Sequence, residues 1–489
     1  MKMRDFSCEE LKSLAVELPD EVSRYEAAGD FEGAGKAIDR WLEKPVGEAM
    51  KTRLRYEKYI IQELPKEFPD TEEEVIRKFR EKLPDFSMED LQRAERENMA
   101  EWILVDGKKH YIHSLIRNLT DKEPEIRRRL GLTEEVTEED QYQQAAIREM
   151  QEKGEKAVRI RLKTSIRLKD ENFVPGMKIR AHLPIPAWLS RTFDVKILNH
   201  AEGKVTVDEP TSMWRSICFE DTLQENRTFF VEYEYVVWTK YLDLWHGEVS
   251  GAEDFNHVRM KYVGDFVACL REQYPHIRFT PYLRSLASEI VGEEKRPMEI
   301  ARRIYDYVTK NVQYSYMRNY SLMTCIPEYC AKNLRGDCGV QALLFITLCR
   351  IAGVPARWES GLYSNPAYVG AHDWAMFYVE PYGWLYADPS LGGSAYAEGD
   401  ENRRRFYFGN VEPFRMAANH EFQQKFSVKK EFLPIDTCDN QLGEMECEER
   451  GFAEDELEIT KEMISYEALL EKRQYLPEYL SGRSCLCYI

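Results

Sequence analysis

The stretch Gly336-Asp337-Cys338-Gly339 constrains this chain more than any other, because it marks the start of a helix. Apolar residues at helical spacing follow it as one stripe as far as Ile351, where a glycine and a proline give the usual stop signals. Asp337 stands at the N-cap position, so Cys338 falls in the first turn, beside unpaired N–H groups and the positive end of the helix dipole. This environment favours the thiolate, which is the nucleophilic form of cysteine.

A second cysteine, Cys349, lies in the same predicted helix but away from its N-terminus. It lacks the advantages of the first turn, and we interpret it as a small buried apolar residue. The candidate nucleophile of the helix is therefore Cys338.

Two predicted strands downstream place a histidine and an aspartate on one face of a hairpin. The strands cover 372–379 and 384–388, with a Pro-Tyr-Gly turn between them. If the hairpin is centred near residue 380, His372 lies eight residues before the centre and Asp388 eight after it. Opposed residues share a face and bring their Cβ atoms within about 5 Å. Asp388 could then orient the imidazole and leave its other ring nitrogen for a nucleophile.

These three residues together predict covalent catalysis. A cysteine activated by such a histidine attacks a carboxamide and forms a thioester. The backbone N–H of Cys338 could stabilise the oxyanion, and we take Tyr316 as the second donor, with Tyr314 behind it. Both tyrosines also fit as core aromatic residues.

A group of aromatic residues near the predicted site has two open interpretations. The group could line an acyl-binding cleft, which makes Trp374 a substrate-binding candidate, or it could simply pack in the core. Its members are Trp358, Tyr363, Tyr368, Trp374 and Trp384.

The motifs around these residues resemble those of the transglutaminase-like superfamily. The sequence Gly336 to Gly339, followed by Leu348-Cys349-Arg350-Ile351-Ala352-Gly353-Val354-Pro355-Ala356-Arg357, is similar to its nucleophile motif. His372-Asp373-Trp374 and Asp388-Pro389-Ser390 are similar to its histidine and aspartate motifs, in the same order. The resemblance is specific over about 296–400, looser over 155–450, and absent from residues 1–150.

The resemblance implies a papain-like α+β core in which a helix carrying the nucleophile packs on an antiparallel sheet. Cys338 would be the nucleophile, His372 the general base and acid, and Asp388 the orienting carboxylate. The family includes cross-linking enzymes, peptidases, amidases, peptide N-glycanases and scaffolds that have lost the triad. Neither the calcium-site segments of animal cross-linking enzymes nor the paired-cysteine zinc site of peptide N-glycanases is recognisable, so we expect no metal and no cofactor.

Composition limits the partners of the chain. Its 489 residues suggest about three or four domains. A net charge of −18 argues against nucleic acid or an anionic membrane as the main partner. The amide chemistry expected at Cys338 implies a peptide or protein substrate. Eleven scattered cysteines without a visible export signal predict reduced thiols and a cytoplasmic location. The oligomeric state is left open.

Changes of pattern along the chain predict four regions. Residues 1–152 read as charged helices with a hairpin around Asp106-Gly107, and 153–242 as an antiparallel β-sandwich. Residues 243–425 form the catalytic core with a leading connector, in which 317–332 reads as a loop. Residues 426–489 are predicted to be an acidic tail that packs on the core, with a last helix near 466–475.

Three functional hypotheses follow. The first is a thiol-dependent enzyme acting on amide bonds, with hydrolysis favoured over transfer to amines. The second is a non-catalytic interaction scaffold built on the same fold. The third is oxidation control, in which Cys325 or Cys330 forms a reversible disulfide with Cys338.

Overall fold

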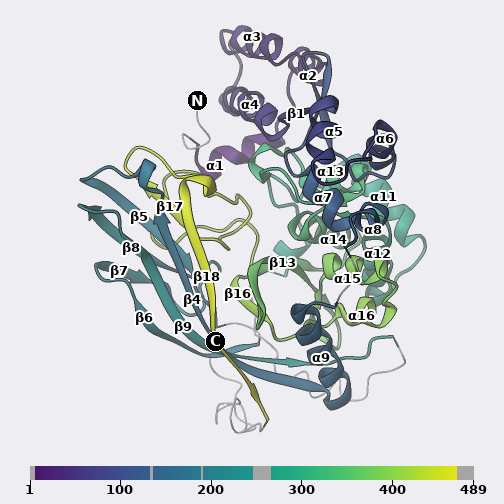
Figure 1. Cartoon of the computed structure of the whole chain (residues 1–489), viewed down its shortest axis with the longest axis vertical. Coiled ribbons are helices and arrows are strands. Elements are labelled where there is room, and N and C mark those ends of the chain that lie inside the picture. The colour runs from purple at the N-terminus through teal and green to yellow at the C-terminus, as the bar shows by residue number, and fades with distance from the viewer. Residues whose placement is uncertain (1–5, 133–135, 189–190, 246–265, 471–489) are drawn as a thin grey trace.

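The computed structural model describes residues 6–132, 136–188, 191–245 and 266–470. Within these ranges the elements form three groups: N-terminal helices, two antiparallel four-stranded sheets, and further helices around a five-stranded antiparallel sheet (Figure 1). The fold is thus mixed α and β with antiparallel sheets, as the sequence predicts. No helix in the described part of the chain is both long and apolar enough to cross a membrane.

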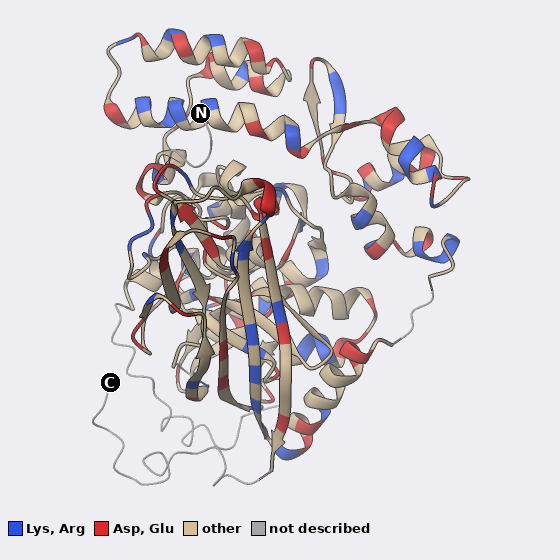
Figure 2. Ribbon diagram, turned by 60° about the vertical axis from the view of Figure 1, so that its left-hand side comes forward, with Lys and Arg blue, Asp and Glu red and all other residues tan. Residues whose placement is uncertain are grey.

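The N-terminal group consists of short helices whose starts are fixed by local capping. Thr71, Ser87 and Thr137 each accept a hydrogen bond from the backbone N–H three residues later, and the acidic side chain at that position bonds back. Acidic and basic residues are interspersed along these helices (Figure 2). The helices are α1 (Cys8–Leu11), α2 (Asp20–Ala27), α3 (Phe31–Leu42), α4 (Glu48–Glu67), α5 (Glu72–Arg80), α6 (Met88–Arg96), α7 (Leu115–Lys122) and α8 (Pro124–Arg129). The next helix, α9 (Glu138–Lys153), lies apart from α1–α6, at the bottom of Figure 1.

The predicted Asp-Gly hairpin forms as β2 (Trp102–Val105) and β3 (Lys108–Tyr111), and β1 (Asp70–Thr71) pairs with β3. Asp106 and Gly107 both have positive φ angles, 48° and 77°, as a tight two-residue hairpin turn requires.

Two four-stranded sheets share one apolar core. Their strand orders are β17-β5-β8-β7 and β18-β4-β9-β6, and side chains from both sheets belong to the same buried cluster. The strands are β4 (Glu155–Leu168), β5 (Met177–Pro184), β6 (Thr192–His200), β7 (Lys204–Val207), β8 (Ser216–Leu223), β9 (Phe229–Lys240), β17 (Glu444–Cys447) and β18 (Leu457–Leu469).

Strands β17 and β18 correct the prediction for the C-terminal tail. Residues 444–447 pair with β5 and residues 457–469 pair with β4 along most of its length (Figure 1), whereas Cys438 and Gln441 before them contact the core. The predicted helix near 466–475 is therefore wrong as far as Leu469, and the part after residue 470 lies outside the described residues. The physical reason is the alternation of Leu457, Ile459 and Met463, which suits a half-buried strand.

The third group surrounds a sheet with the order β15-β14-β13-β12-β16. Its strands are β12 (Ala356–Asn365), β13 (Tyr368–Val379), β14 (Gly383–Ala387), β15 (Phe408–Gly409) and β16 (Arg415–Asn419), and a parallel pair joins β10 (Gln313–Tyr314) to β11 (Arg335–Gly336). The helices are α11 (Pro281–Val291), α12 (Pro297–Asn311), α13 (Ile326–Asn333), α14 (Cys338–Ile351), α15 (Pro389–Ala397) and α16 (Glu401–Phe406). Helix α13 lies where the sequence predicts a loop.

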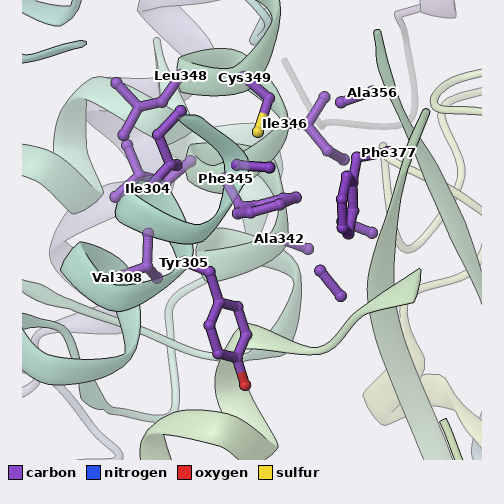
Figure 3. Packing of buried hydrophobic residues seen from close by; sticks show 14 of the residues in the cluster. Ile304, Tyr305, Val308, Ala342, Phe345, Ile346, Leu348, Cys349, Ala356 and Phe377 are labelled. Atoms are coloured by element: carbon purple, nitrogen blue, oxygen red, sulfur yellow. The ribbon is translucent and has the colours of Figure 1, made fainter. Parts of the chain in front are cut away.

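Helix α14 is the centre of this group. The sequence predicts a single apolar stripe, but residues 339–350 are all buried. Figure 3 shows the reason: α12 covers one side of α14 and the sheet covers another, with Phe345 and Phe377 in edge contact at 5.8 Å between ring centroids. A helix enclosed in this way has little freedom to move, so its N-terminus is a rigid place for a reactive side chain.

Candidate active site

The N-terminus of α14 is built as the sequence predicts. The side chain of Asp337 accepts a hydrogen bond from the backbone N–H of Val340 at 3.1 Å, and the Tyr320 hydroxyl donates to the same carboxylate oxygen. Cys338 is the first residue of the helix and is half-buried. Its backbone N–H is among those that have no partner within the helix, so it is free to meet a substrate oxygen.

The glycine after Cys338 is required by close packing. A Cβ atom on Gly339 would lie 2.5 Å from the Tyr320 hydroxyl oxygen and 2.8 Å from Oδ2 of Asp373. Both distances are far below van der Waals contact, so any side chain would push these groups away from Cys338.

We therefore expect Gly339→Ala to disturb the site, with a loss of about 1–3 kcal/mol of stability from overpacking. The matched control is Gly35→Ala in α3, where the added Cβ would find its nearest neighbour at an ordinary 3.6 Å. Thermal unfolding and the rate of Cys338 alkylation, measured on both variants, test this. A Gly339→Ala protein with wild-type stability and wild-type alkylation would contradict it.

His372 and Asp388 meet as predicted from their spacing. Nε2 of His372 lies 2.7 Å from Oδ2 of Asp388. The hairpin is centred on residue 381 rather than 380, because Ala375 pairs with Ala387 and Val379 with Gly383. This shift places Asp388 across from Trp374 rather than His372. The face is unchanged, because residues 372 and 374 point to the same side of β13.

Asp388 is held from several directions and is fully buried. Its other oxygen, Oδ1, accepts hydrogen bonds from the Ser390 hydroxyl and the Leu391 backbone N–H, both at 3.0 Å, and so caps α15. Burial alone would raise the pKa of Asp388, but the charges of His372 and Arg415 outweigh it and hold that pKa well below its usual range. Asp388 is therefore a carboxylate throughout the physiological pH range.

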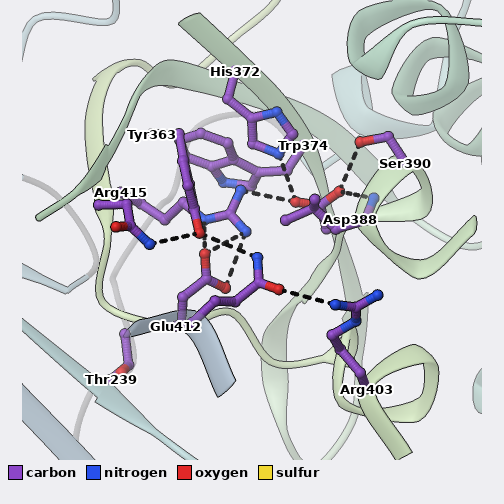
Figure 4. Close-up of polar contacts among 12 residues, drawn as sticks. Thr239, Tyr363, His372, Trp374, Asp388, Ser390, Arg403, Glu412 and Arg415 are labelled. Atoms are coloured by element: carbon purple, nitrogen blue, oxygen red, sulfur yellow. Dashed lines mark hydrogen bonds and ion pairs between the residues drawn. The ribbon is translucent and has the colours of Figure 1, made fainter. Parts of the chain in front are cut away.

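Arg415 supports Asp388, and neither it nor its second partner is predicted from sequence. One guanidinium nitrogen of Arg415 donates to Oδ2 of Asp388 at 2.8 Å. The opposite edge of the guanidinium forms a two-bond pair with Glu412 at 3.0 Å for each bond (Figure 4). All three residues are fully buried. The charges are thus arranged as carboxylate, guanidinium and carboxylate in a line that ends at the imidazole.

Cys338 makes its closest side-chain contact with Asp373, the residue after His372. The thiol of Cys338 donates to Oδ2 of Asp373 at 3.3 Å. Burial, followed by the charges of Asp373 and Asp337, raises the pKa of this thiol, whereas a hydrogen bond from the Asp373 backbone N–H acts in the opposite direction. In this state Cys338 is a thiol rather than a thiolate, which differs from the expectation based on the helix N-terminus alone.

The geometry therefore brings the predicted residues together as two adjacent pairs. Strand β13 pairs with β14 only from Ala375 onward, which leaves its edge at 372–373 open to Cys338. Consecutive strand residues point to opposite faces, so His372 and Asp373 leave β13 in different directions. Among the contacts of the described residues, no hydrogen bond joins Sγ of Cys338 to the His372 ring. The side-chain amide of Gln441 donates both to Asp373 and to the backbone oxygen of His372, so it ties the two positions together.

Several buried acids lie in the core and in the segment that leads into β17. Burial is the main cause that raises the pKa of Asp337 to about 6 and that of Asp439 to about 6. The same cause raises the pKa of Glu444 to about 7. These acids hold protons near neutral pH that the unfolded chain has already released.

We therefore expect the protein to lose stability as the pH rises from about 5 to 8. The raised pKa values mean that the folded state binds more protons than the unfolded state in this window, so the stabilisation is complete below about pH 4 and is lost through pH 6 to 7. Asp388 and Glu359 act in the opposite sense and stabilise the fold above about pH 4. His420 and Arg191 lower the pKa of Glu359 to about 2, although its burial acts to raise it. Thermal unfolding measured from pH 4.5 to 8.5 tests this, with Asp439→Asn expected to flatten the decline. A Tm that rises between pH 5.5 and 8 would contradict it.

Cys338 and Asp373 line a cavity of about 1360 Å³. The cavity lies between the core, the N-terminal helices and the turn before β18, and its walls include Glu67, Arg117, Tyr314, Tyr316, Gln441 and Glu454. His372 is not among the lining residues. The space is large enough for a peptide segment to approach the sulfur.

The predicted binding residues have different surroundings from those expected. The Tyr316 hydroxyl donates to Asp121 of α7 at 3.2 Å, so it is engaged away from the sulfur. Tyr314 lines the cavity together with Cys338, and burial raises the pKa of its hydroxyl. Trp374 is fully buried, is not a cavity residue, and donates from Nε1 to Glu359 at 2.6 Å. It packs beside the His372 ring at 6.0 Å between centroids and supports that ring rather than a substrate.

The cysteines proposed for oxidation control are free thiols. Cys330 is fully buried, and Cys325 donates to the backbone oxygen of His276 at 3.6 Å. Burial raises the pKa of Cys325 to about 11, so this thiol is a poor nucleophile at neutral pH.

Known proteins are similar to the core region of this chain. The sequence profile of the transglutaminase-like superfamily matches residues 284–389. An uncharacterized protein from Haemophilus influenzae is 25% identical over 196 residues, which cover 33% of this chain and 52% of that protein. The chain thus spans about half the length of this curated relative.

Two solved structures are also similar. A candidate cysteine protease from Cytophaga hutchinsonii has a TM-score of 0.40 and 16% identity, covering 65% of this chain and 92% of that chain. The periplasmic domain of TgpA from Pseudomonas aeruginosa has a TM-score of 0.27 and 16% identity, covering 53% of this chain and 96% of that chain. The profile match includes Cys338, His372 and Asp388. Residues 284–389, which include these three positions, therefore match the transglutaminase-like superfamily.

Proposed function

We propose that this protein is a thiol-dependent enzyme that acts on amide bonds of peptides or proteins through an acyl-enzyme at Cys338. The observation that carries the proposal is the His372–Asp388 hydrogen bond of 2.7 Å, fixed by the buried Arg415, one residue along β13 from the position that contacts Sγ of Cys338. Covalent amide chemistry requires a cysteine that substrate can reach and an oriented imidazole to take its proton, and the site supplies these on neighbouring residues of β13 and α14.

In the proposed reaction, His372 takes the proton of Cys338 and the sulfur attacks the carbonyl carbon of the amide. Nε2 of His372 is occupied by Asp388, so Nδ1 is the nitrogen that would receive the proton. The C–N bond then breaks, the amine leaves with that proton, and a thioester remains on the sulfur. The backbone N–H of Cys338, with Tyr314 in place of Tyr316, would stabilise the oxyanion. Water or a second amine attacks the thioester, and the thiol is regenerated.

This route requires the sulfur to exchange one partner for another. In the resting state the thiol donates to Asp373. A contact between the sulfur and the imidazole would have to form as substrate enters the cavity, since catalytic hydrogen bonds often form only in the substrate complex. We propose hydrolysis as the main reaction and transfer to amines as the secondary one.

Electrophilic labelling and an unbiased digest test the proposal together. Iodoacetamide should alkylate wild-type protein at Cys338, and Cys338→Ala should lose this labelling. The matched control is Cys447→Ala, which removes another half-buried thiol and should keep the labelling at Cys338. A peptide library incubated with and without an added amine should show cleaved or amine-modified products with wild type and Cys447→Ala only. Equal labelling and equal turnover in wild type and Cys338→Ala would end the proposal.

The second candidate function is a non-catalytic scaffold. The specific observation that favours it is that the described contacts join Cys338 to Asp373 and not to His372. On this hypothesis the thiol is structural, and neither wild type nor any variant turns over the library. We also propose that the helices up to about residue 152 form one module, and that residues 153–242 form a second module together with the returning strands β17 and β18.

A further inference from the structure

The loop after β10 forms the wall of the cavity nearest to the N-terminal helices. Tyr316, Arg318 and Tyr320 of this loop line the cavity together with Cys338. The end of the loop is connected to the reactive residue, because the Tyr320 hydroxyl donates to Asp337, the N-cap of α14. Whatever fixes this loop therefore fixes one side of the candidate active site.

Helix α7 holds the backbone of the loop at a single residue. Oδ1 of Asn118 accepts a hydrogen bond from the backbone N–H of Tyr316 at 2.7 Å, and Nδ2 of Asn118 donates to the backbone oxygen of Tyr316 at 3.4 Å. The Ser114 hydroxyl donates to that same oxygen at 2.9 Å. Asn118 is 2% exposed and Ser114 7% exposed. Both backbone groups of Tyr316 are thus satisfied by side chains from one turn of α7, shielded from water.

Other contacts hold the rest of the loop from the same side. The guanidinium of Arg117 stacks on the Tyr316 ring at 3.7 Å, and Asp121 accepts from the Tyr316 hydroxyl. Glu101 pairs with Arg318, and the Tyr56 hydroxyl donates to the backbone oxygen of Ser321 at 3.0 Å. The loop is therefore held along its length by residues that lie outside the family match at 284–389.

We propose that the N-terminal helices form part of the substrate-binding site, and that Asn118 is a positioning residue that sets the loop wall against which an extended peptide lies. The inference rests on the proposed function, since it assigns a specificity role in the same cavity. Loss of the Asn118 contacts leaves the backbone N–H of Tyr316 without its partner and leaves the backbone oxygen held by Ser114 alone, so the wall is less firmly fixed. A peptide must fit this wall, whereas a small reagent reaches the sulfur without touching it.

The test compares two probes of different size on the full-length protein. Second-order rates of Cys338 alkylation are measured with iodoacetamide and with a tetrapeptidyl chloromethyl ketone, in which the sulfur displaces the halide of each reagent. We expect Asn118→Ala to lower the ratio of the peptidyl rate to the iodoacetamide rate by about tenfold, and Ser114→Ala by about threefold, consistent with one or two net hydrogen bonds. Thr120→Ala is the matched control, because the hydrogen bonds of this buried hydroxyl stay within α7.

An unchanged ratio of the peptidyl rate to the iodoacetamide rate in Asn118→Ala would overturn the inference. An equal drop in Asn118→Ala and Thr120→Ala would also overturn it, because it would indicate a structural effect alone. If Asn118→Ala does not fold, the ratio in Ser114→Ala decides. Failure of the proposed function gives a different result, since neither probe would then label Cys338 faster than Cys447 in the wild-type protein.

Discussion

Replacing His372 with alanine is expected to lower kcat for amide cleavage by about a thousandfold or more while leaving the fold intact. General acid and base catalysis contributes about 10²–10⁴-fold, and removing one member of a cooperating set has a larger effect than its share. The fold should survive, because Asp388 keeps Arg415, the Ser390 hydroxyl and the Leu391 backbone N–H as partners. His372 is itself close to the surface, with 9% exposure.

The measurement is kcat and KM for a peptide found in the library digest, together with the pH dependence of iodoacetamide labelling. His200→Ala is the control, because this exposed histidine lies in β6 and contacts only the neighbouring backbone oxygen of Ala201 and the Phe219 ring. In wild type the labelling rate should rise as the thiol loses its proton, and His372→Ala should require a higher pH for the same rate. If His372→Ala retains wild-type turnover, the imidazole has no catalytic part and the scaffold hypothesis is favoured.

The parts of the site that the sequence predicts are those set by local rules. Asp337 caps α14, Cys338 opens it, and His372 shares a face with Asp388. The hairpin prediction gives the correct face although its centre is wrong. Moving the centre from residue 380 to 381 changes which residues are opposed but preserves the face.

The parts that sequence could not predict come from segments far apart in the chain. Arg415 reaches Asp388 from β16, and Gln441 reaches Asp373 from a segment that precedes β17. No local pattern predicts such contacts, because a lone arginine or glutamine is usually solvated. Asp373 is the most consequential omission. The hairpin pattern indicates only which face His372 occupies. The open strand edge lets the next residue, Asp373, contact the thiol.

The C-terminal tail differs, because its sequence does contain a pattern that predicts the observed strand. Leu457, Ile459 and Met463 alternate with polar residues, and this period of two predicts a strand. The error arose from expecting the two-sheet unit to be contiguous in sequence. The chain instead leaves this unit after β9, forms the core, and returns with β17 and β18. The returning segment also connects the two-sheet unit to the cavity, because Glu454 in the turn before β18 lies in the cavity wall.

Replacing Arg415 with methionine is expected to have the largest effect on stability of any substitution considered for the site. Arg415 is the shared partner of two fully buried carboxylates, Asp388 and Glu412. Removing one member of a buried ion pair typically costs about 3–5 kcal/mol, because the charge left behind has neither water nor a counterion. Here Glu412 loses both bonds of its pair, whereas Asp388 keeps His372. Methionine fills much of the same volume, so the cost is mainly electrostatic rather than a cavity.

Chemical denaturation of Arg415→Met against wild type measures this loss, and Arg40→Met is the control, since its pair with Glu21 is about half exposed and should contribute less than about 1 kcal/mol. The double variant Arg415→Met/Glu412→Leu should recover part of the loss, because it also removes the stranded charge. It should not recover full activity, since the pKa of Asp388 is no longer held down by the guanidinium and the imidazole loses part of its anchor. A single variant as stable as Arg40→Met would mean that Glu412 is neutral in the folded protein, and that the line of charges leading to His372 does not act as described.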